Sequence, residues 1–243
     1  MQSAKEEIEL ELGVKFGIKQ FAAAAGVVCA MAAMAATKPA SAQDQVPLGI
    51  KLPKEVFAGT SYDLPPDCHP EKISTKPRPI PLVPKGTVNV ALKKKITSSS
   101  KAISGTLDLV TDGDKEGRED STLALKSKLQ WIQIDLEESV PIYYILVWHF
   151  HQEPVVVHSV IVQVSNDPTF VNGVTTIYNN DQANKEGLGA GKDREYFENY
   201  EGRLMDAKGV KGRYVRLYSN GSTYRDPLNR YNEVEIYGVP AAK

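Results

Sequence analysis

Beyond Gly86, apolar and polar residues alternate over short runs, which is typical of strands buried on one face. The clearest run is 131–136, WIQIDL, whose three aliphatic side chains fall on one face. The run 142–149 is almost continuously apolar and predicts a strand covered on both faces. Further strand-like runs are 87–92, 156–165, 174–178, 214–218 and 233–237. Residues 107–110 form either a strand or a single helical turn, with the turn favoured, and no longer run has a helical period, so the pattern predicts an all-β antiparallel sandwich or barrel.

The first 42 residues have the features of a signal peptide. Residues 21–36 are apolar without a charge, follow two lysines, and precede the small-residue triplet 40–42. We therefore expect cleavage after Ala42 and a secreted or extracytoplasmic protein, in the periplasm or at the cell surface, with no stable membrane span afterwards. A retained anchor is the alternative, although a span needs about 20 residues. Four glutamates within residues 1–13 depart from the usual positive start.

Residues 43–85 form a proline-rich segment with nine prolines, which fix φ and remove backbone donors. The stretch KPRPIPLVPK within it predicts an extended strap. The segment is either a free linker or a strap that packs on the folded domain. Packing is favoured because Ile80, Leu82 and Val83 would rarely occur in a fully solvated linker.

Composition excludes several classes of protein. With 42% hydrophobic and 24% charged residues, the chain is able to bury a core, and a net charge of −1 provides no basic field for nucleic acid. Two cysteines, Cys29 and Cys68, exclude a disulfide framework and an all-cysteine zinc site. After cleavage Cys68 would be a spare thiol, and with His69 alone it would be a poor metal site.

Five segments in order resemble the discoidin family, the coagulation-factor C-type domains with a galactose-binding-like jelly roll. They are LVTDGD (109–114), QWIQIDL (130–136), VQVSNDPTF (162–170), RYVRLYSNGS (213–222) and NEVEIYG (232–238). The resemblance covers residues 86–239. It implies an eight-stranded antiparallel jelly-roll β-sandwich, usually secreted or at a cell surface and usually without catalytic activity.

The sequence Asp112-Gly113-Asp114 places two carboxylates beside a glycine that permits a tight turn. Calcium prefers six to eight oxygen ligands from carboxylates and carbonyls. The resemblance implies a structural calcium ion, with Asp112 and Glu233 as side-chain ligands and carbonyls from Asp114 and Asn232. The alternative is that this sequence forms a turn and nothing more.

A second candidate site is a sugar site on rim loops. Sugar recognition combines an aromatic face with planar polar groups. The resemblance to carbohydrate-binding members suggests His149 or His151, Arg216, Asn220 and Tyr224. The alternatives are structural, since His149 lies beside core positions and Arg216 would stack on a sheet face. The spacing of His149 and His151 also suits zinc, but no third ligand is evident.

Topology raises a difficulty for this sugar site. If successive strands are antiparallel, loops 150–155 and 180–212 open on one rim and loop 219–230 opens on the other. The long insertion 180–211 is itself a candidate functional loop, because structureless connections of that length are uncommon.

Catalytic motifs are absent from the sequence, and the glycine run 187–191 lacks the strand–helix context of a phosphate loop. We therefore expect an exported non-catalytic module that binds an extracellular carbohydrate or glycoconjugate and is stiffened by calcium. A structural or adhesion module that binds a protein surface is the alternative. A secreted enzyme with an unrecognised site is a third class.

Overall fold

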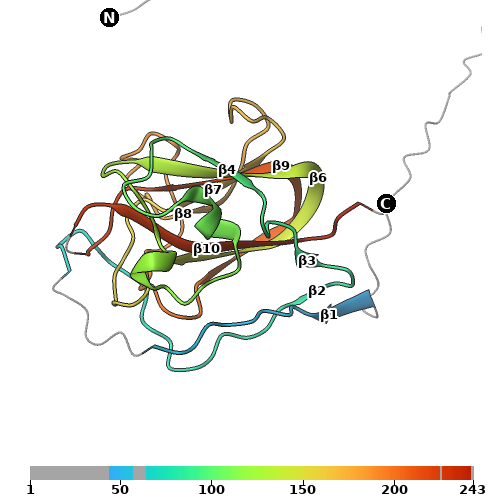
Figure 1. Ribbon diagram of the computed structural model, residues 1–243, viewed down its shortest axis with the longest axis horizontal. Helices are drawn as coiled ribbons and strands as arrows, with labels where there is room; N and C mark the ends of the chain where they lie inside the picture. Colours follow the sequence, from blue (N-terminus) through green and yellow to red (C-terminus); the bar gives the residue numbers. More distant parts are fainter. Residues whose placement is uncertain (1–43, 57–63, 225, 242–243) are drawn as a thin grey trace, which may run out of the picture. The chain divides into compact units, whose positions relative to one another are not determined.

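The computed structural model describes residues 44–56, 64–224 and 226–241, so the predicted signal peptide lies outside the described residues. Eight antiparallel strands form the main sheet system (Figure 1). They are β3 (Val88–Asn89), β4 (Lys95–Ser98), β5 (Leu123–Leu125), β6 (Gln130–His149), β7 (Ile161–Ser165), β8 (Thr175–Asn179), β9 (Arg203–Ser219) and β10 (Asn229–Gly238). The predicted eight-stranded antiparallel sandwich is confirmed. No helix in the described part is long and apolar enough to cross a membrane.

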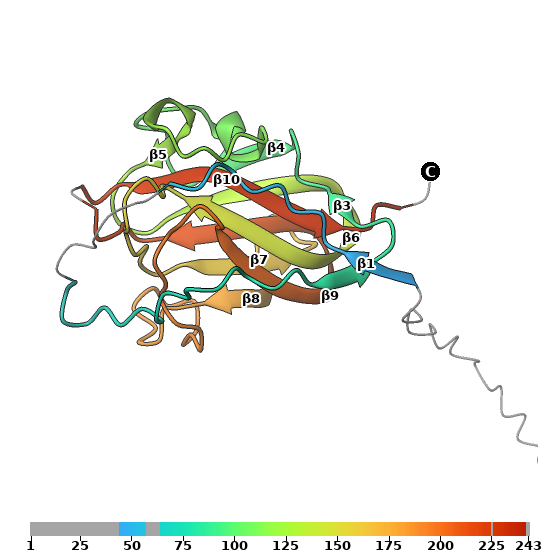
Figure 2. The same cartoon turned by 90° about the horizontal axis from the view of Figure 1, so that it is seen from below.

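The two longest strands, β6 and β9, run through both layers of the sandwich (Figure 2). The first part of β6 pairs with β4, and its second part pairs with β10. Between the two parts, Glu137 has a φ of 71°, where the register with β9 shifts. The runs 131–136 and 142–149, predicted as separate strands, are therefore one bent strand. Aliphatic side chains from both parts enclose the core, for example Ile134 and Ile145.

The short elements differ from the prediction in instructive ways. Only Val88–Asn89 of the predicted strand 87–92 pairs, and Val88 is half exposed. The polar edge strand β4 and the three-residue β5 lack a readable alternation and were not predicted. Residues 107–110 lie in the 3-10 helix η2 (Leu107–Thr111), as predicted, and η3 (Glu119–Ser121) follows it. The predicted loop 180–211 ends earlier, because β9 begins at Arg203.

The proline-rich segment packs on the sandwich. Its two-stranded ladder joins β1 (Gln45–Pro47) to β2 (Leu82–Pro84). Leu48 and Val83 are buried against the outer face of the sheet, where Trp148 lies. The predicted packing is thus confirmed for Val83 and wrong for Ile80 and Leu82, which are 66% and 58% exposed. An extended chain turns successive side chains to opposite faces, so Leu82 points away when Val83 points in.

The bends in β6 and β9 bring both ends of β6 to the same end of the sandwich. The Ser219 hydroxyl, opposite the start of β6, lies 2.7 Å from the hydroxyl of Tyr231, which pairs with His149 at the other end of β6. At this end the His158 amide donates to the Gly221 carbonyl at 2.9 Å. The prediction that loops 150–155 and 219–230 open on opposite rims is therefore wrong, because it treated β6 as two separate antiparallel strands.

Candidate functional site

The loops that meet at this end of the sandwich enclose a cavity of about 440 Å³, which we call the end cavity. Four parts of the chain line it: the strap, the turn before β7, the loop after β8, and the turn after β9. The lining residues are Pro65, Asp67, Cys68, His69, His158, Ser159, Asn180, Asp181, Gln182, Ala183, Lys185, Glu186, Glu195 and Asn220. Most of these residues have a polar group in the side chain, so the cavity offers hydrogen-bonding groups to a ligand.

Hydrogen bonds hold the polar wall of the end cavity in place. The Asp181 carboxylate accepts from the backbone amides of Lys185 and Glu186 at 2.9 and 2.8 Å, which closes the loop after β8. Glu186 Oε1 accepts from the Ser159 hydroxyl at 2.9 Å and from Asn220 Nδ2 at 2.7 Å. The loop after β8 is thereby tied to the turns before β7 and after β9, which keeps the cavity wall preorganised.

One corner of the end cavity contains Cys68, His158 and Glu195. Their potential ligand atoms all lie within 4.8 Å of one another, and no other such group of three occurs among the described histidine, cysteine and acidic residues. His158 Nδ1 lies 3.2 Å from Glu195 Oε1, and the His69 amide donates to Glu195 Oε2 at 2.9 Å.

Burial and the neighbouring carboxylate of Glu195 raise the pKa of the Cys68 thiol to about 12. Burial also acts to raise the pKa of Glu195, but hydrogen bonds from His158, the His69 amide and Cys68 together hold that pKa below its ordinary value. Without a metal, the corner therefore contains a neutral thiol beside an ionised carboxylate.

The two histidines predicted as sugar ligands are in the interior, each 1% exposed. His149 Nδ1 lies 2.7 Å from Glu198 Oε1, and its ring centroid lies 4.8 Å from that of Tyr231. His151 Nε2 lies 2.9 Å from the Lys115 carbonyl oxygen. Both rings are therefore part of the packed interior, and the pair belongs to no group of three potential metal ligands among the described residues.

Arg216 lies on an outer sheet face, between the rings of Trp131 and Phe170, with centroid distances of 4.4 and 4.1 Å. Its guanidinium also donates to Gln133 Oε1 at 2.8 Å, so the structural alternative for Arg216 holds.

Tyr224 makes an edge contact with Phe150 at 5.3 Å and lies under the guanidinium of Arg230. Among the predicted sugar ligands only Asn220 lines the end cavity. The structure therefore does not assemble His149, His151, Arg216, Asn220 and Tyr224 into one site.

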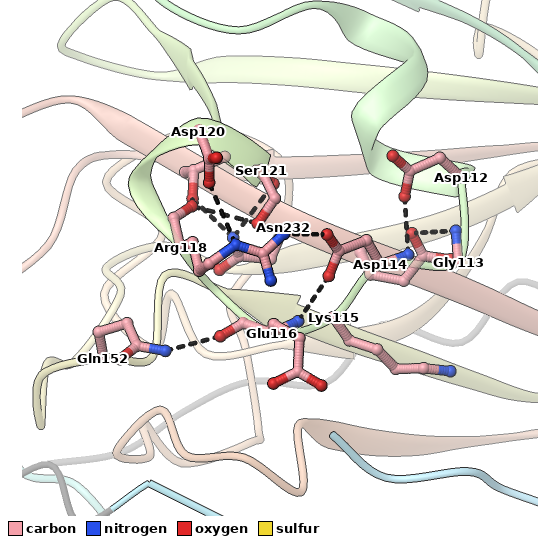
Figure 3. A network of polar contacts seen from close by, with 12 residues as sticks. Asp112, Gly113, Asp114, Lys115, Glu116, Arg118, Asp120, Ser121, Gln152 and Asn232 are labelled. Carbon is pink, nitrogen blue, oxygen red and sulfur yellow. Dashed lines mark hydrogen bonds and ion pairs between the residues drawn. The ribbon is translucent and has the colours of Figure 1, made fainter. Parts of the chain in front are cut away.

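The predicted calcium loop is brought against β10. The Gly113 amide donates to Glu233 Oε2 at 3.2 Å. The Asp114 amide donates to Asp112 Oδ1 at 2.7 Å, as Figure 3 shows. Glu233 is fully buried, and its Oε1 has no hydrogen-bond partner within the described part of the chain. Burial, with the nearby charges of Glu235 and Asp112, raises the pKa of Glu233 to about 9.

The other two predicted calcium ligands are arranged differently. The Asp114 side chain accepts from the Arg118 guanidinium at 2.7 Å and from the Glu116 amide at 3.0 Å, so both of its carboxylate oxygens already have partners. The Asn232 amide donates to the Thr122 hydroxyl at 2.6 Å and lies beside Ser121 in Figure 3. Among the predicted ligands, Asp112 and Glu233 are thus the side chains that approach each other. An unpartnered buried carboxylate oxygen beside a second carboxylate fits a cation.

The protein is therefore an antiparallel β-sandwich, with the end cavity between the loops at one end. No family model and no curated protein matches this chain. Among solved structures, a fucose-binding module of Streptococcus pneumoniae is 18% identical with a TM-score of 0.43, and the match covers 64% of this chain and 99% of that module.

Two further solved structures are a chitosan-binding module from a Paenibacillus chitosanase/glucanase and the lectin domain of lectinolysin with bound Lewis B antigen. They are 23% and 14% identical, with TM-scores of 0.39 and 0.43. The matches cover 62% and 61% of this chain, and 99% and 95% of those chains. These neighbours, matched over nearly their whole length, are carbohydrate-binding modules.

Proposed function

We propose that this protein is an exported, non-catalytic module that holds an extracellular carbohydrate or glycoconjugate in the end cavity. The observation that carries the proposal is the end cavity itself, about 440 Å³ in volume and lined by polar side chains from four parts of the chain. Its volume lies within the range of roughly 300–1,000 Å³ that is usual for small-ligand sites.

The chemistry of the wall suits a polyol. Sugar hydroxyls both donate and accept hydrogen bonds, so they pair with carboxylates, amides and imidazoles held at fixed positions. Glu186 and Asn220, each partly exposed, are fixed by their mutual hydrogen bond, and His158 also lines the cavity. The lining residues that the structure describes include no phenylalanine, tyrosine or tryptophan, so hydrogen bonds to these described side chains would dominate recognition of a ligand there.

A structural calcium ion belongs to the same proposal. Asp112 and Glu233 would supply carboxylate oxygens, and backbone carbonyls of the loop 112–114 and of Asn232 would complete the shell. The ion would neutralise the buried carboxylate of Glu233 and bind the loop to β10. It supports the fold and takes no part in ligand recognition.

The proposal is tested by glycan-array binding of the full-length chain, followed by calorimetric titration of the best ligand. Asn220→Ala and Glu186→Gln should each weaken binding by about tenfold or more, since each removes a hydrogen-bonding group from the cavity wall. Arg216→Ala is the matched control, because Arg216 lies on an outer sheet face and should leave the affinity unchanged.

Two results would overturn this proposal. Loss of binding in Arg216→Ala with full binding in Asn220→Ala would place the site elsewhere. Failure to bind any glycan, together with a protein partner recovered by cross-linking, would favour the adhesion alternative.

A further inference from the structure

Three segments far apart in the sequence meet at one corner of the end cavity, and each contributes a side chain of a different ligand type. Cys68 comes from the strap, His158 from the turn before β7, and Glu195 from the loop before β9. Cys68 is 6% exposed, and the other two are partly buried. The proposed carbohydrate site does not require this combination, because sugars have no use for a buried thiol.

The backbone around each of the three residues is fixed. The Cys68 amide donates to the Pro65 carbonyl at 2.9 Å, which forms a turn. The amide and the carbonyl of His158 both pair with the turn after β9. The Glu195 carbonyl accepts from the Glu71 amide at 2.8 Å, so the strap is bonded directly to this corner. Backbone hydrogen bonds therefore hold all three residues at this corner.

We propose that Cys68, His158 and Glu195 bind a zinc ion, with the fourth coordination position open to the end cavity. Thiolate, imidazole and carboxylate are the three protein ligands that zinc prefers, and three protein ligands plus an open position is a common zinc arrangement. In a tetrahedral zinc site a nitrogen and an oxygen ligand lie about 3.3 Å apart, from their bond lengths. His158 Nδ1 and Glu195 Oε1, which share a hydrogen bond at 3.2 Å, are close to that separation, and all three potential ligand atoms lie within 4.8 Å of one another.

A reactive thiol is the other role that a cysteine could have here. Nucleophilic or redox-active cysteines have lowered pKa values and lie in electropositive surroundings. Cys68 has the opposite surroundings, because it is buried, 6% exposed, beside the acidic side chain of Glu195. Zinc binding would displace the thiol proton, as it does wherever a cysteine becomes a ligand.

The test uses the full-length chain, reduced and freed of metal with a chelator, and titrated with Co²⁺ as a spectroscopic probe for zinc. We expect one cobalt ion per chain, a thiolate-to-cobalt absorption band, and displacement of that band by Zn²⁺. Cys68→Ser should abolish the band. His158→Gln and Glu195→Gln should weaken cobalt binding by at least about tenfold, because each removes a ligand.

Cys29→Ser is the matched control, since it removes the other cysteine and should keep the band. Circular dichroism establishes that each variant is folded. If Cys68→Ser fails to fold, the partly exposed His158→Gln decides the question. The absence of a thiolate band, unchanged affinity in His158→Gln, or loss of the band in Cys29→Ser would each overturn the zinc site. All measurements are made without glycan, so the zinc site and the carbohydrate proposal fail or hold separately.

Discussion

Glu233 provides a quantitative test of the loop that we propose as the calcium site. Its carboxylate is fully buried on β10, and only the Gly113 amide is bonded to it among the described residues, at Oε2. Burial foremost, and then the charges of Glu235 and Asp112, raise its pKa from 4.5 to about 9. The perturbation is Glu233→Gln, which keeps the shape of the side chain and stays neutral at every pH.

The expected effect follows from the pKa difference between the folded and unfolded chains. In metal-free protein at pH 7, Glu233 is protonated when folded and ionised when unfolded. One pKa unit corresponds to about 1.4 kcal/mol. At pH 7 the unfolded chain is stabilised by ionisation of Glu233 above its ordinary pKa of 4.5, which lowers the free energy of unfolding by about 3 kcal/mol. The sign is set by the raised folded pKa: the stability linked to protonated Glu233 is fully present below 4.5 and is lost progressively up to about 9.

Urea unfolding between about pH 5 and pH 8, in the presence of a chelator, measures this effect. Glu233→Gln should equal the wild type near the acidic end and exceed it by up to about 3 kcal/mol at pH 7. Added calcium should stabilise the wild type and have little effect on the variant. The control is Glu137→Gln, whose side chain is 67% exposed, and it should keep the pH slope of the wild type. Parallel stability curves for wild type and Glu233→Gln would refute the reasoning.

Three further predictions concern the packing of the domain. Leu48→Ala should lower the free energy of unfolding by about 2 kcal/mol in urea titrations, because it opens a gap between the strap and the sheet; an unchanged midpoint would mean that the strap does not pack. Gly117→Ala should lower the Tm, because Gly117 has a φ of 72° and a Cβ there would lie 2.8 Å from the His151 ring. Gly49→Ala is the control and should leave the Tm unchanged, because a Cβ at Gly49 would have no heavy atom within 4 Å. Arg216→Lys should destabilise the fold by about 1 kcal/mol in the same urea assay despite keeping the charge, since lysine lacks the planar group that stacks between two aromatic rings.

The sandwich could be predicted from the sequence because each strand repeats its inward-facing residue every second position. That local rule applies to 131–136 and 142–149 separately, so it cannot show that both belong to the single strand β6. The bend between them depends on pairing with β9, which is distant in the sequence. For the same reason the sequence misplaced the loop 219–230 relative to the loop after β6.

The candidate sites also differ in how far they could be predicted from the sequence. The contact between the loop at Asp112 and Glu233 was predictable, because the resemblance to a known family carried both residues. The predicted sugar ligands His149 and His151 were misread, because their residue type suits a ligand and only the neighbouring polypeptide reveals that they are covered. The sequence contains Cys68, His158 and Glu195, but they are far apart along it, so nothing in their spacing indicates that they lie together in the fold.

Hydrophobic alternation predicted short antiparallel strands in a sandwich or barrel, the resemblance to a known family favoured the sandwich, and the prolines of 43–85 marked an extension without regular ladders. Tertiary structure alone decided which residues of the extension pack on the sheet, that one end of the sandwich brings the loops together around a cavity, and that three distant side chains share one corner of it. The physical reason is that strand formation reflects local periodicity, whereas a cavity depends on long-range contacts that are formed only when the chain folds.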